Sequence, residues 1–404
     1  MDSRILHTNS PSIRSSGAES CVFERALNMF EEIALEKVKD FDGRGISSIL
    51  YAMAKDCYKP KTCLVSEFER RAVELAKEFD AQAVANILWS FAQMKWRAGK
   101  QLMEVLAERV EEMIGSFDYY SIASILWAFA TLDAKPRQRL MDLIMVQAGK
   151  VVADFNSHTL ANTLWACAKL QHSSRRLMGL LEQQAEATAG GFKPQDITNT
   201  LWAFATLEMI PGKKLFQLLE RRAVDCSESF KSENITNTLW AYATMEKKPG
   251  DQMIGMLERR LAAESGNISL DHFVDVMWAF GTMGRKPGER VLGLLLRRAE
   301  EISGDFTQQD HKVLQWAFET LEIESGIKPR EVVLGGERPL QQRQVEEASG
   351  RTGGGCHALW GGYEFTGAGM KTNTKSNKRK NPERREKEAQ RAAGLAEDDA
   401  GGKM

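Results

Sequence analysis

The sequence predicts an all-α fold, an α-α superhelical solenoid of about eight 38-residue helix-turn-helix repeats. Seven of the nine tryptophans are spaced 37 or 38 residues apart, and an aromatic or aliphatic residue lies ten positions before each of them. In five repeats a proline lies nine positions after the tryptophan or its equivalent. One step upstream of the first tryptophan lies Tyr51, which extends the array to eight copies. The repeated core position is occupied by Tyr51, Trp89, Trp127, Trp165, Trp202, Trp240, Trp278 and Trp316.

Each repeat is predicted to contain two helices joined by a turn. Positions in a repeat are numbered here from the tryptophan or Tyr51 as zero. Position −10 is phenylalanine in seven of the eight copies and Ile268 in the other. Proline fixes φ and has no amide hydrogen, so it suits the first turn of a following helix. The prolines at position +9 are Pro60, Pro136, Pro211, Pro249 and Pro287.

The first helix of a repeat, for example residues 196–207, is apolar around nearly its whole circumference. Helical geometry leaves only positions −7, −6, −3 and +4 as a narrow polar stripe. We therefore expect neighbouring repeats to enclose this helix and to leave one face open. This open face is the candidate binding surface.

The second helix of a repeat is amphipathic on one side, with apolar residues such as Leu215, Leu218 and Leu219 at positions +13, +16 and +17. Its other face carries charge, as in the run Glu220-Arg221-Arg222. This pattern is typical of the outer, convex layer of a superhelix. The arginines of these runs are interpreted as solvated surface rather than as a ligand site.

The regions that flank the repeats have a different composition. Residues 1–18 are serine-rich and weakly resemble a transit peptide, or else form a disordered N-terminus. Residues 19–40 resemble a lone outer helix that caps the array, which itself covers residues 41–340. Residues 341–370 are predicted as a glycine-rich linker and residues 371–404 as a charged, disordered tail. The basic run of this tail is interpreted as a nuclear-import signal, a phosphate-contacting arm or a solvated segment, and comprises Lys378, Arg379, Lys380, Arg384 and Arg385.

Composition excludes several classes of protein. The 404 residues have a formal net charge of −1, which argues against tight nucleic-acid binding through net charge alone. The six cysteines form no Cys-x-x-Cys pair, so we expect neither a zinc site nor a disulfide framework. A reducing intracellular compartment is therefore expected. No apolar stretch approaches the roughly 20 residues that span a bilayer. The chain is predicted to be soluble, without metal or cofactor.

The sequence contains no recognisable catalytic constellation, so we predict that the protein is not an enzyme. The six histidines are scattered through the chain. The glycine-rich segment near residue 353 lacks a Gly-Lys-Ser ending, which excludes a nucleotide-binding loop. What remains is a periodic recognition surface.

Small polar residues recur at position −3 of the otherwise apolar first helix. As a binding surface, these side chains would present hydrogen-bond donors and acceptors to an extended ligand. As a structural device, they would form an asparagine ladder that links neighbouring repeats. Positions −7 and −6 vary strongly, which is typical of one-base-per-repeat RNA readers and also of unconstrained solvent positions. The candidate RNA-binding residues are Gln82, Asn86, Ser124, His158, Asn162, Gln195, Asn199, Asn234, Asn237 and Asp275.

Acidic residues on the stripe support a second interpretation. Glu233 and Asp271 at position −7, and Asp196 and Asp310 at position −6, would repel phosphate. Helical solenoids also bind extended peptides and partner helices. A protein-binding or peptide-binding scaffold is therefore the alternative function.

The motif Ile-Thr-Asn-Thr-Leu-Trp-Ala-Phe-Ala-Thr-Leu at residues 197–207, with its relatives every 38 residues, resembles the octotricopeptide repeat family. Similar units occur in heptatricopeptide and FAST-kinase-like proteins and in a kinetoplastid RNA-editing substrate-binding complex subunit. The resemblance covers roughly residues 41–325. No RAP domain is recognisable in the tail, although many members end in one, and the Pro-Pro-Pro start of many octotricopeptide units is missing.

This resemblance implies a protein that binds single-stranded mRNA or rRNA of an organelle, selectively in sequence and at about one base per repeat. The bound RNA would be guided through processing, stabilisation or translation. The resemblance implies no cofactor. The expected compartment is a mitochondrion or chloroplast, with the nucleus or cytosol as alternatives. We expect a monomer without membrane insertion that works beside other RNA-processing proteins.

Overall fold

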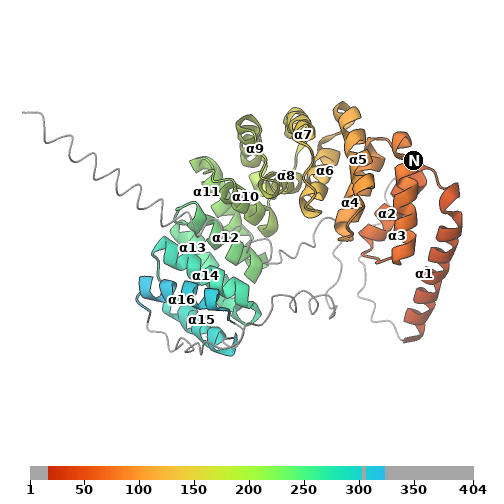
Figure 1. Cartoon of the computed structure of the whole chain (residues 1–404). Helices are drawn as coiled ribbons and strands as arrows, with labels where there is room; N and C mark the ends of the chain where they lie inside the picture. The colour runs from red at the N-terminus through yellow and green to blue at the C-terminus, as the bar shows by residue number, and fades with distance from the viewer. Residues whose placement is uncertain (1–16, 303–305, 324–404) are drawn as a thin grey trace, which may run out of the picture.

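The computed structural model describes residues 17–302 and 306–323, and these residues form sixteen α-helices and short 3-10 helices, without a β-strand among them. Figure 1 shows the helices following one another along an arc, from α1 at one end to α15 and α16 at the other. Each helix packs on its neighbours in the series. The predicted all-α solenoid of helix-turn-helix repeats is confirmed.

The even-numbered helices form the inner layer and contact one another along the array. In Figure 1 they line the concave side, and α5, α7, α9 and α11 lie on the convex side. The inner helices are α2 (Gly43–Lys55), α4 (Ala81–Gln93), α6 (Tyr119–Thr131), α8 (Ser157–Lys169), α10 (Pro194–Thr206), α12 (Ser232–Thr244), α14 (Leu270–Met283) and α16 (Gln308–Thr320).

The odd-numbered helices form the outer layer, and in most repeats a 3-10 turn leads from the outer helix to the next inner helix. The prolines at +9 lie two residues before an outer helix begins, so the expectation that they occupy its first turn is wrong. The outer helices are α1 (Gly17–Lys37), α3 (Thr62–Glu74), α5 (Lys100–Glu112), α7 (Gln138–Val151), α9 (Arg175–Thr188), α11 (Lys213–Asp225), α13 (Asp251–Ala263) and α15 (Glu289–Ile302). The 3-10 turns are η1 (Val38–Asp40), η2 (Ala76–Glu78), η3 (Ile114–Ser116), η4 (Val152–Asp154), η5 (Ala189–Gly191), η6 (Ser227–Ser229) and η7 (Ser265–Asn267).

Local signals at both ends fix the length of the inner helices. A short polar side chain accepts a hydrogen bond from the third residue beyond it, as Asp80 does from the amide of Ala83 at 2.8 Å. Each inner helix ends at position +4 or +5, and at position +6 the backbone turns left-handed with φ between 51° and 60°. Such a residue closes a helix by directing the next amide back to an earlier carbonyl. Seven of the eight residues at +6 are not glycine, Gly284 being the exception.

The tryptophans and the small residues beside them form the core between inner helices. Trp202 is 4% exposed and stacks on Trp240 of the next repeat, with ring centroids 6.4 Å apart. Ala203 and Ala205 are fully buried or nearly so, which lets the helices on either side approach closely. Trp316 is 41% exposed, because no further inner helix covers it within the described residues.

A repeated hydrogen bond links each outer helix from α3 to α15 to a turn that lies 29 or 30 residues earlier in the chain. An arginine or glutamine of the outer helix donates to the main-chain carbonyl of the residue at position −10, at distances from 2.7 to 3.3 Å. The interpretation of the outer-helix arginines as solvated surface is therefore wrong for Arg71, Arg222 and Arg260. The donors are Arg71, Arg109, Gln147, Gln184, Arg222, Arg260 and Arg298, and the acceptors are Phe41, Phe79, Phe117, Phe155, Phe192, Phe230 and Ile268.

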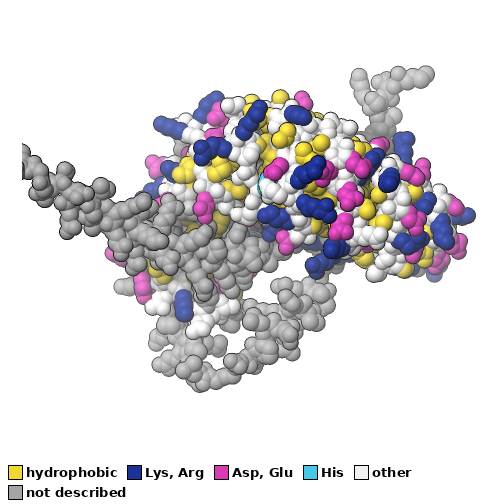
Figure 2. Space-filling model, turned by 45° about the horizontal axis from the view of Figure 1, so that its top comes forward, with side chains coloured by type: hydrophobic (Ala, Val, Ile, Leu, Met, Phe, Trp, Pro, Cys, Tyr) yellow, Lys and Arg dark blue, Asp and Glu magenta, His cyan; other side chains and the backbone are white. Residues whose placement is uncertain are grey.

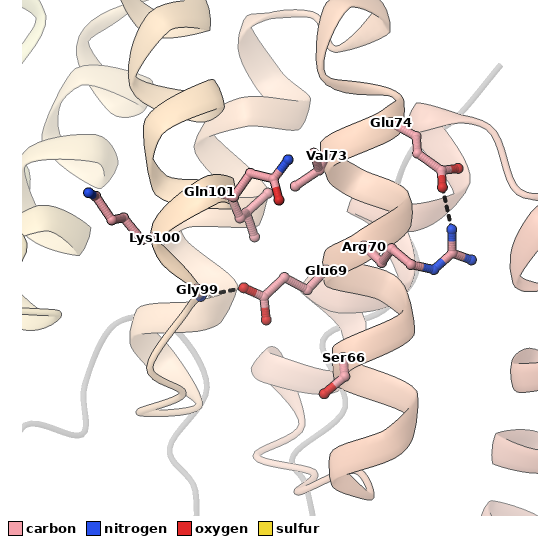
Figure 3. A pocket seen from close by; sticks show the side chains of 9 residues that line it. Ser66, Glu69, Arg70, Val73, Glu74, Gly99, Lys100 and Gln101 are labelled. Atoms are coloured by element: carbon pink, nitrogen blue, oxygen red, sulfur yellow. Dashed lines mark hydrogen bonds and ion pairs between the residues drawn. The ribbon is translucent and has the colours of Figure 1, made fainter.

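Glutamates of the outer helices make a second recurring link, to the amide at the start of the next outer helix. Figure 3 shows Glu69 of α3 directed at the amide of Gly99, which precedes α5. Glu220 accepts in the same way from the amide of Gly250, at 3.0 Å. In α1 the corresponding residue is Glu31, whose carboxylate accepts from the amide of Lys61 at 2.8 Å. Helix α1 thus packs as an outer helix, and its function as a cap stays a prediction.

Candidate nucleic-acid interface

The polar stripe of the inner helices is not an open face in the middle of the array. At position −3 the side chains of the third to sixth repeats are at most 7% exposed. Only Gln82 among the candidate residues is exposed, whereas Asn86, His158, Gln195 and Asp275 are half-buried. The buried candidates are Ser124, Asn162, Asn199, Asn234 and Asn237.

Three of the four asparagines at −3, namely Asn86, Asn162 and Asn199, bond to the residue one turn earlier in their own helix. The amide of Gln195 donates to the Oδ1 of Asn199 at 3.0 Å, and the Nδ2 of Asn162 lies 3.2 Å from the Nε2 of His158. Ser124 likewise donates to the carbonyl of Tyr120 at 2.7 Å. These bonds satisfy polar groups on the buried side of the helix, but they run within one helix and not to the next repeat, as the expected asparagine ladder would.

Contacts between repeats run from position −7 of one inner helix to position −6 of the next. The Nδ1 of His158 lies 3.0 Å from the Oδ1 of Asp196, and Asn234 donates to the Oε1 of Gln195 at 3.2 Å. Asp196 is 2% exposed and also accepts from the amide of Lys193 at 3.0 Å. Asn162 can only donate through Nδ2, so His158 accepts at Nε2 and donates through Nδ1. A polar ladder therefore joins α8, α10 and α12.

The hydrogen bonding of the stripe is incomplete in the sixth and seventh repeats. Asn237 is 2% exposed, and its Nδ2 has no hydrogen-bond partner in the described part of the chain. The same holds for the Nδ1 of His272 at position −6 of α14. Burial lowers the pKa of His272, against the opposing effect of the neighbouring Asp271 carboxylate, so this imidazole is neutral at pH 7.

Replacing Asn199 by alanine is expected to lower the free energy of unfolding by about 1–3 kcal/mol, because it leaves the amide of Gln195 without its buried acceptor. RNA affinity measured well below the melting temperature should not change. The matched control is Gln82→Ala, which removes an exposed side chain from the same polar stripe. Urea unfolding and a binding titration check both statements. An Asn199→Ala variant with native stability and weakened RNA binding would instead make this column a contact surface.

The core and tail residues fall into three groups. Trp89, Trp127, Trp165, Trp202 and Trp240 are at most 9% exposed. Tyr51 and Trp278 are half-buried, whereas Trp316 lies on the surface. The basic run at residues 378–385 lies outside the described residues, as do residues 1–16 and 324–404 of the flanking regions.

A basic surface runs along the turns that join each inner helix to its outer helix. Between positions +4 and +12, the first seven repeats carry nineteen Lys or Arg against six Asp or Glu. All nineteen cationic side chains are exposed. We call these nineteen residues the basic edge. They are Lys55, Lys59, Lys61, Lys95, Arg97, Lys100, Lys135, Arg137, Arg139, Lys169, Arg175, Arg176, Lys213, Lys214, Lys247, Lys248, Arg285, Lys286 and Arg290.

The opposite edge of the solenoid is acidic. Between positions −16 and −7, the same seven repeats carry sixteen Asp or Glu against seven Lys or Arg. An inner helix of 13 residues separates the two edges by about 20 Å. The two edges therefore carry opposite charge although the chain as a whole is almost neutral.

The basic edge is not apparent from the net charge of the chain or from the residues of the inner stripe. Charge grouped by repeat position, instead of along the chain, would have found it. The face of the molecule in Figure 2 carries cationic and anionic side chains next to one another, with hydrophobic side chains between them. A surface so mixed conceals an excess of one sign that follows a single row of turns.

The described residues contain no group of three or more His, Cys, Asp or Glu placed to hold a metal ion. None of their helices is both long and apolar enough to cross a membrane.

A comparison with protein-family models matches residues 24–246, more than half of the chain, to the RNA-editing substrate-binding complex 6 protein. The chain belongs to this family. The match begins in α1 and ends just after α12, so it includes the polar ladder and most of the basic edge. No curated protein matches the chain.

Membership of the RNA-editing substrate-binding complex 6 family bears on the resemblances drawn from the repeat motif. The resemblance to an RNA-editing substrate-binding complex subunit is confirmed. The likeness to octotricopeptide, heptatricopeptide and FAST-kinase-like proteins stays a prediction.

Proposed function

We propose that this protein binds single-stranded RNA as a non-catalytic subunit of an RNA-editing or RNA-processing assembly. The observation that carries the proposal is the family match over the repeats, since the family is named for an RNA-editing substrate-binding complex. A curved helical array with a row of exposed cations suits an extended polyanion. The protein supplies a binding surface, and partner proteins supply any chemistry.

We propose that sequence selectivity comes from position −7. Position −3 is buried in the third to sixth repeats, whereas position −7 is exposed or half-buried throughout the second to fifth repeats, at Gln82, Tyr120, His158 and Gln195. A solenoid that reads one base per repeat uses two or three side chains of each repeat. We therefore propose a weaker preference at these positions than a complete one-base-per-repeat code would give.

We propose a mitochondrial location, because the resemblance and the family description both concern RNA editing and because the first residues resemble a transit peptide. Organellar mRNA or rRNA is the corresponding ligand class. A chloroplast location has no comparable support. Import of a fluorescent fusion that carries residues 1–40 tests the location independently of RNA binding.

A protein-binding scaffold is the second candidate function, and one observation favours it. Helix α1 exposes three apolar side chains on one face, Met29, Phe30 and Ile33, at 61%, 41% and 53% exposure. Contiguous exposed apolar side chains are typical of contact surfaces for other proteins. A subunit of an assembly needs such a surface in addition to any RNA-binding surface.

Crosslinking and immunoprecipitation of the tagged protein test the proposed function. We expect RNA well above the background of an untagged strain, enriched in organellar transcripts. Recovery of partner proteins without crosslinked RNA would reject RNA binding and favour the scaffold. Nuclease treatment before capture separates direct RNA contact from RNA carried by partners.

A further inference from the structure

We propose that the basic edge, and not the inner polar stripe, holds the RNA, through contacts to its phosphate backbone along successive repeats. The inference rests on the proposed function and deepens it, because it names the surface and the part of the ligand that it recognises. Phosphate contacts supply most of the affinity of sequence-independent binding. Affinity and any base preference then come from opposite ends of the inner helices.

The basic edge has the free charge that such contacts need. Lys135, Lys213, Lys247 and Lys248 are exposed and make no ion pair within the described residues. Other members are paired, as Lys214 is with Glu186 at 2.7 Å. The lysine of this pair is 74% exposed, and ion pairs in contact with water are worth little, so a phosphate can replace the carboxylate at small cost.

The dipoles of the inner helices favour only those cations of the edge that lie in their last turns, such as Lys55 and Lys169. The outer helices begin here, and their N-terminal ends carry partial positive charge that disfavours nearby cations. Helices α5, α9 and α11 nevertheless have no acidic residue in their first turn. They begin instead with Lys100, with Arg175-Arg176 and with Lys213-Lys214. Both the helix ends and the side chains attract an anion at the same place.

The ligand that fits this row is a polyanion with evenly spaced charge. Two or three cations recur in every one of the first seven repeats, and neighbouring helices pack about 8–10 Å apart. That separation is about one Debye length at 0.1 M salt, so cations of adjacent repeats act together on one strand. The acidic edge lies about 20 Å away and is screened. An RNA backbone has this regular charge, whereas an acidic protein segment does not.

The test compares two variants of the full chain that change net charge equally. The edge variant carries Lys135→Gln, Lys213→Gln, Lys247→Gln and Lys248→Gln. The control variant carries four lysine-to-glutamine changes at exposed positions near the acidic edge, namely K77Q, K150Q, K193Q and K231Q. Both change only exposed side chains, and thermal melts that match the native protein establish that each is folded.

Binding is measured by fluorescence anisotropy with a labelled oligouridine at several salt concentrations, and with an oligoglutamate as a second probe. Each lost phosphate contact should make the negative slope of log K against log salt shallower by about 0.7. It should also weaken binding about fivefold at 0.1 M salt. The edge variant should therefore bind RNA between about tenfold and a few hundredfold more weakly, while the control variant binds like the native protein.

Other outcomes overturn the inference in different ways. Equal RNA affinities of the native protein and the edge variant would reject the basic edge and leave RNA binding in place. Equal losses in both variants would show that net charge matters instead of this surface. An edge variant that keeps RNA affinity but loses oligoglutamate would assign the edge to an acidic protein. A native protein that binds neither oligouridine nor a mixed-sequence RNA would reject the proposed function itself.

Discussion

Replacing Trp202 by alanine is expected to lower the free energy of unfolding by about 3–5 kcal/mol, the usual cost of truncating a large buried aromatic side chain. The indole is 4% exposed and stacks on Trp240, so the change removes contact area inside α10 and between two repeats. In a repeat array each unit is stabilised mainly by its neighbours. The fifth repeat therefore becomes a weak point, and the unfolding transition should broaden or divide into two steps.

Trp316→Ala is the matched control, because the same residue type occupies the same repeat position in α16 but is 41% exposed. We expect it to cost less than half as much as the Trp202 change and to leave a single transition. Urea unfolding followed by far-ultraviolet circular dichroism measures both. Equal losses in the two variants would mean that the stacked tryptophans contribute no coupling between repeats.

The tryptophan spacing predicted the fold well because one physical requirement recurs in every unit. A repeat cannot bury its apolar face alone, so the same large side chain returns at each interface. The order of inner and outer helices followed from the same pattern, because the first helix of each repeat is apolar all round and the second on one side only. The 3-10 turns before the inner helices were not predicted, since they arise from main-chain geometry at the start of each repeat.

The openness of the inner stripe could not be predicted, because a helical projection gives direction and not the distance to the neighbouring helix. Ala203 and Ala205 are small and buried, so the adjacent inner helices approach closely and cover Asn199. The basic edge was not predicted for another reason. Its charges are distributed over seven repeats and are offset in the total by the acidic edge.

The outer-helix arginines show where sequence patterns mislead. On a helical projection Arg222 falls on the charged face of α11, next to the exposed Arg221. In the structure its Nε donates to the carbonyl of Phe192 at 2.7 Å, and that phenylalanine is fully buried. A side chain that is long enough to reach the preceding turn therefore links two repeats while part of it remains in water.

Arg222→Ala is expected to lower the free energy of unfolding by about 1.5–3 kcal/mol, because a charged donor is removed from a main-chain acceptor in a partly buried turn. Arg221→Ala should stay within about 0.5 kcal/mol of the native protein, as exposed substitutions usually do. Equilibrium unfolding in urea measures all variants. Equal losses for Arg221 and Arg222 would show that the link to Phe192 contributes nothing.

The chain itself supplies a conservative replacement for this test. Gln147 occupies the same repeat position as Arg222 and Gln184 the position before it, and they donate to the corresponding carbonyls at 2.9 and 2.7 Å. Arg222→Gln should therefore recover most of the stability that Arg222→Ala loses. If glutamine instead behaves like alanine, the contribution of Arg222 comes from its charge near the end of the outer helix. If glutamine restores stability, a neutral hydrogen bond is sufficient to join adjacent repeats, and the arginines at this position are not needed for their charge.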